Sequence, residues 1–175
     1  MSNRTKRSRE TDSIEDEPTD SASPDGLTVD LWTRRPVCGP RTTVIDRLSS
    51  LRAAGKLADF SITTWPEEIV VSGRTEHSDL LDTIEEFEAW AEDNDVTLRP
   101  PFETRTASLL VGASEEVLTT PMMLAAAYDG DDLVAVYPCR DGDQTWTIGA
   151  FLEALDGEPG DPVTDPERLP GLATR

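Results

Sequence analysis

Two apolar runs around an acidic turn give the clearest structural signal in the chain. The first extends from Met122 to Tyr128 and the second from Leu133 to Tyr137, with the turn sequence Asp-Gly-Asp-Asp between them. Short apolar runs that flank an Asp-Gly turn are typical of a β-hairpin. Because both runs are apolar at nearly every position, we expect each strand to be buried on both faces and the hairpin to be central to the fold.

Three segments have the apolar spacing of amphipathic helices. Thr147 can cap the last one, and Gly157 can end it. The first is expected to begin at Pro40 and to stop at Gly55. The middle and longest one is expected to begin with Ser78 or Asp79 as its cap. Its two sides differ: the apolar stripe comprises Leu80, Leu81, Ile84, Phe87, Trp90 and Ala91, and the opposite side is acidic.

Shorter alternating patterns predict the remaining strands. These strands are Leu27–Thr33, Phe60–Thr64, Thr106–Val111 and Val117–Thr119. Ile69–Val71 is expected to extend the second of them after the Trp65-Pro66 break. The pair between 106 and 119 has two interpretations: it is either an inserted hairpin or a lengthening of the central sheet.

The predicted elements specify an α/β domain in two layers, because each amphipathic helix needs a sheet on which to bury its apolar side. With 175 residues, the chain has room for one core and its tails. We expect a single domain over residues 27–156. The polar segments 1–26 and 157–175, which are rich in Pro and charged residues or Pro and Gly, are expected to be disordered.

The charge is strongly acidic, with 35 acidic and 16 basic residues and a formal net charge of −19. Molar salt screens such charges to within a few ångströms. The surface resembles that of proteins from salt-accumulating haloarchaea, which implies that the acidity reflects habitat more than partner. The N-terminus lacks the apolar core of a signal peptide, and no apolar stretch reaches membrane-spanning length. We expect a cytoplasmic protein without a membrane partner.

Metal and cofactor chemistry find little support in the composition. Cys38, Cys139 and His77 cannot supply the closely spaced ligand pairs of a zinc site. Paired catalytic carboxylates, a Gly-rich phosphate loop and a Ser-His-Asp arrangement do not stand out. We therefore expect neither a metal nor a cofactor, and a binding role in preference to an enzymatic one. His77 is expected to be exposed and without a role.

The sequence Cys38-Gly39-Pro40-Arg41 lies between the first strand and the first helix. A cysteine at a helix N-terminus beside arginines is favoured as a thiolate. The chain resembles the thioredoxin and glutaredoxin fold, in the order β-α-β-α-β-β-α with an extra strand or hairpin before the last β-hairpin. The similar pieces are VDLWT, CGPR, TTPMMLAAAYDGDDLVAVY and FLEAL. The resemblance implies that Pro121 is a cis-proline that faces the loop of Cys38.

Arg41 occupies the position of that family's second, resolving cysteine. Without a resolving thiol the ordinary dithiol cycle cannot close. Three alternatives follow for Cys38: a monothiol redox or sensing role, pairing with Cys139, or an inert side chain.

Basic residues gather in the segment from Arg34 to Lys56, where Asp46 is the one acidic residue. They suit an anion or a partner at the helix N-terminus. The candidate binding residues are Arg34, Arg35, Arg41, Arg47 and Arg52. The alternatives are contact with DNA, with an acidic patch on a partner or a second copy, or simple balancing of neighbouring carboxylates.

The chain also resembles small haloarchaeal proteins grouped under a helix-turn-helix domain family. The matching pieces are VDLWTR, FEAWAEDNDVTLRPPFETR and LVAVYP. That resemblance implies DNA-linked regulation. We therefore expect a non-enzymatic binding or regulatory protein that works through the basic segment 34–56, with a thiol-based role for Cys38 and a DNA-binding regulator as the two alternatives.

Overall fold

The computed structural model describes residues 26–72, 77–99, 102–108, 112, 114–157 and 171. The predicted disordered tails fall almost wholly outside these residues. Among the described helices, none is long and apolar enough to span a membrane.

A four-stranded sheet forms the centre of the protein, with the order β2-β1-β6-β7. β1 (Leu27–Thr33) runs parallel to β2 (Asp59–Thr64) and antiparallel to β6 (Met123–Asp129). β6 turns at Gly130 into β7 (Asp132–Tyr137), so the predicted central hairpin is confirmed. The first strand also has the predicted bounds.

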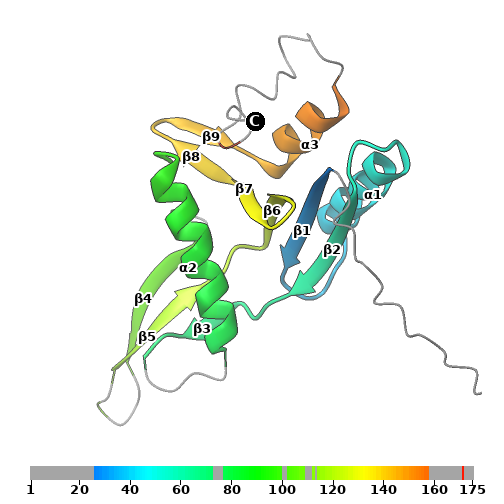
Figure 1. Ribbon diagram of the computed structural model, residues 1–175. Coiled ribbons are helices and arrows are strands. Elements are labelled where there is room, and N and C mark those ends of the chain that lie inside the picture. Colours follow the sequence, from blue (N-terminus) through cyan, green and yellow to red (C-terminus); the bar gives the residue numbers. More distant parts are fainter. Residues whose placement is uncertain are drawn as a thin grey trace, which may run out of the picture.

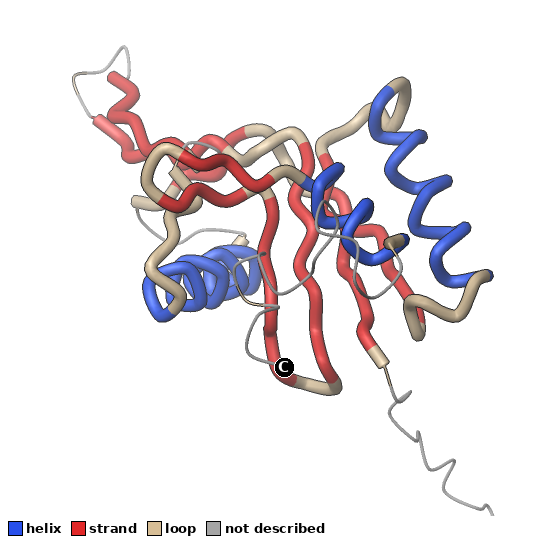
Figure 2. Tube along the Cα trace, turned by 90° about the horizontal axis from the view of Figure 1, so that it is seen from above, coloured by secondary structure: helices blue, strands red, loops and turns tan. Residues whose placement is uncertain are grey.

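Helices cover both faces of this sheet (Figures 1 and 2). α1 (Pro40–Ala53) and α3 (Ile148–Asp156) pack against each other. On their face, Phe151 of α3 stacks on Tyr137 of β7, with ring centroids 4.8 Å apart. α2 (Ser78–Asp93) contacts β7 from the other side. These layers confirm the predicted α/β class.

The position of α2 on the opposite face follows from strand alternation. Leu31 and Trp32 are neighbours in β1, so their side chains point to opposite faces. Leu31 shares a row with Ala125 and Tyr137, on the face of α3. The indole of Trp32 meets Phe87 of α2 at 6.2 Å, with the rings edge to face. Alternate side chains of β1 therefore pack against different helices: Leu31 lies on the face covered by α3, and Trp32 lies on the face covered by α2.

A second sheet, antiparallel throughout, consists of β3 (Glu68–Val70), β5 (Ser114–Thr119) and β4 (Glu103–Ser108), with β5 in the middle. The expected extension of the second strand by Ile69–Val71 is wrong, because this segment pairs with β5 and not with the central sheet. The break at Pro66 explains the change, since proline has no N–H for a ladder bond. Of the two interpretations of residues 106–119, the inserted hairpin is the observed one.

Two short features differ from the sequence analysis. A small hairpin, β8 (Cys139–Asp141) with β9 (Gln144–Trp146), turns at Gly142 with a φ of 54°. In the sequence, the feature that indicates this hairpin is the Asp141-Gly142 pair between two short segments. The N-cap of α2 is His77 and not Ser78 or Asp79, and it makes no side-chain capping bond. Thr147 caps α3 as predicted, since its Oγ1 accepts a bond from the Ala150 N–H at 3.1 Å.

Buried side chains from both sheets and all three helices form one continuous core. The alanines at 125, 126 and 127 in β6 are all buried. Small side chains are required there because β6 lies between two strands and is covered by helices on both faces. Low strand propensity is thus outweighed by packing at this site.

Trp65 lies where the two sheets join. It is 3% exposed, and its ring packs against Trp32 at 5.4 Å and Phe102 at 5.7 Å. Its indole Nε1 donates a hydrogen bond to the Pro121 carbonyl at 3.0 Å. Trp65 therefore links the end of β2 to the connection between β5 and β6.

Trp65→Phe is expected to lower the free energy of unfolding by about 1–3 kcal/mol, because it leaves the buried Pro121 carbonyl without its donor. Trp146→Phe is the matched control, since the Trp146 Nε1 is buried but has no acceptor in the described part of the chain. Chemical denaturation followed by far-UV circular dichroism measures both. Equal losses in the two variants would contradict a structural role for the Trp65 hydrogen bond.

Candidate functional site

The segment Thr120–Met122 crosses from one sheet to the other and is bonded on both sides. The Arg34 backbone N–H donates to the Met122 carbonyl at 3.1 Å, at the end of β1. The Thr120 N–H donates to the Glu67 carbonyl at 3.0 Å, and Thr120 Oγ1 donates to the Pro66 carbonyl at 2.7 Å. The backbone of this crossing is therefore fixed before any ligand arrives.

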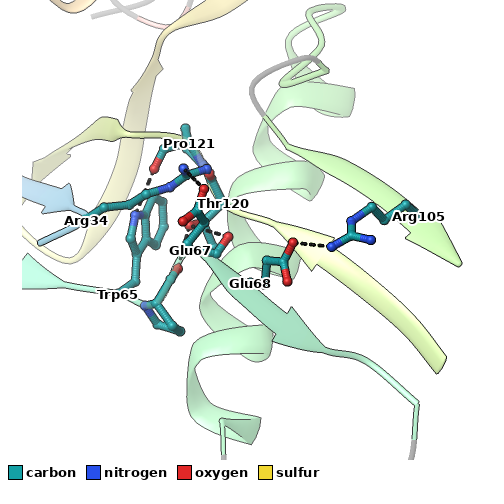
Figure 3. A network of polar contacts seen from close by, with 8 residues as sticks. Arg34, Trp65, Glu67, Glu68, Arg105, Thr120 and Pro121 are labelled. Atoms are coloured by element: carbon teal, nitrogen blue, oxygen red, sulfur yellow. Dashed lines mark hydrogen bonds and ion pairs between the residues drawn. The ribbon is translucent and has the colours of Figure 1, made fainter. Parts of the chain in front are cut away.

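Arg34 adds a side-chain clamp at the same place (Figure 3). Its Nη1 donates to Glu67 Oε1 at 2.9 Å, and its Nη2 donates to the Thr120 carbonyl. The side chain is 19% exposed, whereas that of Glu67 is largely in solvent. The Arg34 Nε is buried and has no acceptor among the described residues. The clamp therefore acts through Nη1 and Nη2, while Nε is shielded from solvent.

A groove of about 650 Å³ opens next to this clamp. We call it the Arg34 groove. Its described lining comes from the residue after β1, from α1, from the first residue of β4, from the end of β5 through the start of β6, from the residue after β7, and from the start of α3. These residues are Arg34, Val44, Glu103, Thr119, Thr120, Pro121, Met122, Met123, Pro138, Thr147, Ile148 and Gly149. Apart from Arg34 and Glu103, these residues are uncharged.

The groove combines an apolar surface with positive electrostatics. Met122 is 55% exposed, an unusual state for a large apolar side chain at a concave site. The N-terminal turn of α3 carries the partial positive charge of its unsatisfied N–H groups. A groove of this kind favours a ligand that has an apolar body and a negatively charged group.

Pro121 lies in the wall of the groove, but its predicted cis peptide bond is wrong. In the described chain the cis bonds are Arg35-Pro36 and Tyr137-Pro138. Thr120 is instead held by its hydrogen bonds to residues 66 and 67, which fix the approach to Pro121 with a trans bond. The residue that the structure brings to this segment from the loop after β1 is Arg34, through its hydrogen bond to the Thr120 carbonyl, and the expectation that Pro121 faces the loop of Cys38 stays a prediction.

The two cysteines are not brought together as a disulfide. Cys38 is exposed, Cys139 is buried, and both are free thiols. Burial is the main reason that the pKa of the Cys139 thiol is raised to about 12, with a smaller contribution from Asp141. The Cys139 thiol is therefore protonated at neutral pH and belongs to the core. The alternative in which Cys38 pairs with Cys139 is wrong, because both are free thiols. Cys38 is absent from the described lining of the groove, and its role as a reactive thiol stays a prediction.

The other predicted binding arginines are spread along α1 and its flanks. Arg47 pairs with Asp156 of α3 at 3.1 Å, and Arg52 pairs with Asp59 of β2 at 3.1 Å. Arg41 donates to the Pro36 carbonyl. Arg35 is exposed and makes no ion pair within the described residues. Of the five arginines, Arg34 is the one that lines the groove.

Sequence reasoning missed much of the groove. Met122 was assigned to a buried strand, yet it precedes β6 and faces solvent. The available signal was Pro121, because a residue next to a proline is a frequent strand boundary. Glu67 and Glu103 lie far from Arg34 in the sequence, and no local pattern marks them.

Comparison with known proteins gives one match, to a helix-turn-helix domain family over residues 21–160. The chain belongs to this family. Neither a curated protein nor a solved structure matches it. Within this family member, α1 and α2 are not joined by a short turn, because β2 and β3 lie between them.

Arg34→Ala is expected to destabilise the fold, because it removes charged hydrogen bonds to Glu67 and to a buried backbone carbonyl. Bonds to charged groups contribute about 1.5–3 kcal/mol each in favourable cases, and the exposed Glu67 carboxylate falls at the low end. Arg35→Ala, the adjacent and exposed control, is expected to change stability by less than about 0.5 kcal/mol. Urea unfolding compares them, and an Arg35 loss as large as that of Arg34 would rule out the clamp.

Proposed function

We propose that this helix-turn-helix family protein is a non-enzymatic regulatory binding protein, and that its ligand or partner occupies the Arg34 groove. On this proposal the binding surface includes the start of the basic segment 34–56, at Arg34, and does not extend along all of α1. We further propose a thioredoxin-like core. The parallel β1/β2 pair around α1, followed by an antiparallel hairpin and α3, supports it.

The single observation that carries the proposal is the exposed apolar wall beside a restrained arginine. Met122 is 55% exposed in the groove, and the partly buried Met123 and Val44, which also pack against the core, line it as well. Exposed apolar surface in a concave site is typical of a binding site. The fixed backbone of Thr120–Met122 means that binding would require little reordering, which favours affinity.

The ligand class follows from the lining. Arg34 lines the groove with its guanidinium, and α3 presents its N-terminal turn there, so a carboxylate, phosphate or sulfonate is favoured. Glu103 disfavours a second negative group at its own end of the groove. A peptide or small molecule with one anionic end and an apolar body fits this pattern best.

The anionic apolar dye 1-anilinonaphthalene-8-sulfonate is a direct probe of this chemistry. We expect the folded protein to enhance its fluorescence, and Met122→Glu to weaken binding by about tenfold or more, equivalent to about 1.4 kcal/mol. Val70→Glu introduces the same charge at an exposed apolar residue of β3 and is expected to leave the affinity unchanged. Equal effects of the two variants, or no binding to the wild type, would contradict the proposal.

DNA binding is the second candidate, and the family match favours it. The surface that would meet phosphates is α1 with its preceding loop, where Arg35 has no competing ion pair and Arg47 is about half exposed. Two observations weigh against it. The basic side chains of α1 are mostly engaged with carboxylates, and molar salt weakens phosphate contacts steeply.

Fluorescence anisotropy with a labelled duplex, repeated over a series of potassium chloride concentrations, tests this candidate. If α1 contacts phosphates, Arg35→Glu with Arg47→Glu should weaken binding on every sequence and reduce the salt slope by about two. Arg105→Glu, on the second sheet, gives the control for charge alone. A duplex that stays free in dilute salt would eliminate the DNA-binding candidate while leaving the groove proposal intact.

A further inference from the structure

The outer edge of β2 is an open end of the central sheet. β2 is the terminal strand in the order β2-β1-β6-β7, and among the described residues β1 is the one strand that pairs with it. An edge strand presents unpaired backbone N–H and C=O groups along its free side. Ile62, in the middle of β2, is 43% exposed although it shares a row with the fully buried Leu31. Backbone and side chain of β2 are thus both incompletely covered.

This edge carries a single charged residue, Asp59 at the start of β2. Residues 60–65 contain no charged side chain. The edge strands of the second sheet differ, since β3 carries Glu68 and β4 carries Glu103 and Arg105. Natural proteins use such charges to prevent pairing between sheet edges. β2 has a charge only at its first residue, Asp59, and none along the rest of the strand, in a chain with 35 acidic residues.

The surroundings of β2 are also the least acidic part of the molecule. Residues 34–66 contain six basic residues against Asp46 and Asp59, whereas the whole chain has a net charge of −19. The carboxylate nearest to the edge, Asp59, is paired with Arg52 at 3.1 Å. Two copies of this chain repel each other over most orientations. Facing β2 sides bring few carboxylates together, and molar salt screens the remaining charge of the two basic segments.

We propose that the β2 edge binds a second copy of this chain. The two β2 strands pair antiparallel about a two-fold axis near Ile62, which joins two four-stranded sheets into one continuous sheet of eight strands. A strand edge is complementary to itself under a two-fold rotation, and this is the commonest symmetry of homodimers. Ile62 packs against its counterpart, and each α1, which contacts its own β2, flanks the junction.

The dimer surface is separate from the Arg34 groove, so neither proposal depends on the other. Ile62 is not among the described residues that line the groove. Two-fold pairing at β2 would place two grooves on one particle. A dimeric ligand or two equivalent binding sites on a partner would then be bound with an avidity that a monomer lacks.

Sedimentation velocity of the full chain, from micromolar to millimolar concentration in dilute and in molar potassium chloride, tests the proposal. The wild type is expected to form dimers that dissociate on dilution and are favoured by salt, because screening reduces the repulsion. Ile62→Lys should raise the dissociation constant by about tenfold or more, since a buried interfacial charge is costly. Val70→Lys, at a similarly exposed residue of β3, is the matched control and should not change it.

Cross-linking gives a second measurement that does not depend on the lysine variant. In a Cys38→Ser background, Ile62→Cys is expected to form a covalent dimer under mild oxidation, and Val70→Cys is not. A wild type that stays monomeric throughout, a dimer that survives Ile62→Lys, or cross-linking that is equal at positions 62 and 70 would each overturn the proposal.

Discussion

The hydrogen-bonded crossing at Thr120–Met122 is the constraint on which the rest of the molecule depends. Polar backbone groups inside a core must find partners, and here they find them on both sides, at residues 33 and 34 after β1 and at residues 66 and 67 before β3. The indole of Trp65 and the guanidinium of Arg34 satisfy two further carbonyls. Two sheets that share no ladder are thereby held in one fixed relation.

The Arg34 groove is a consequence of that junction. The crossing must leave the second sheet and enter β6, so its apolar residues reach the surface where α1 and α3 do not cover them. Most other basic side chains near α1 are paired with carboxylates. Arg34 is also paired with a carboxylate, that of Glu67 at 2.9 Å, but it donates in addition to the Thr120 carbonyl, which restrains its guanidinium beside the groove. The N-terminal turn of α3 adds its partial positive charge at the same groove.

The chain belongs to a helix-turn-helix family, but its described helices are not arranged as two helices joined by a short turn. The family match covers residues 21–160 and so includes both sheets and all three helices. In this chain the helices are separated by strands, and function has to be argued from surfaces instead of from the family label. Within the described part of the chain, the groove and the β2 edge are two surfaces where large apolar side chains, Met122 and Ile62, are exposed.

The sequence by itself determined the local elements: the β6–β7 hairpin, β1, the three helices and the Thr147 cap, because each depends on short-range periodicity or capping. It did not determine that residues 68–70 leave the central sheet, that Pro121 is trans, or that Met122 is exposed. Those features depend on partners 30 to 90 residues away, such as Glu67 for Arg34 and Pro121 for Trp65. Only tertiary packing decided them, because strand pairing and side-chain coverage are long-range properties.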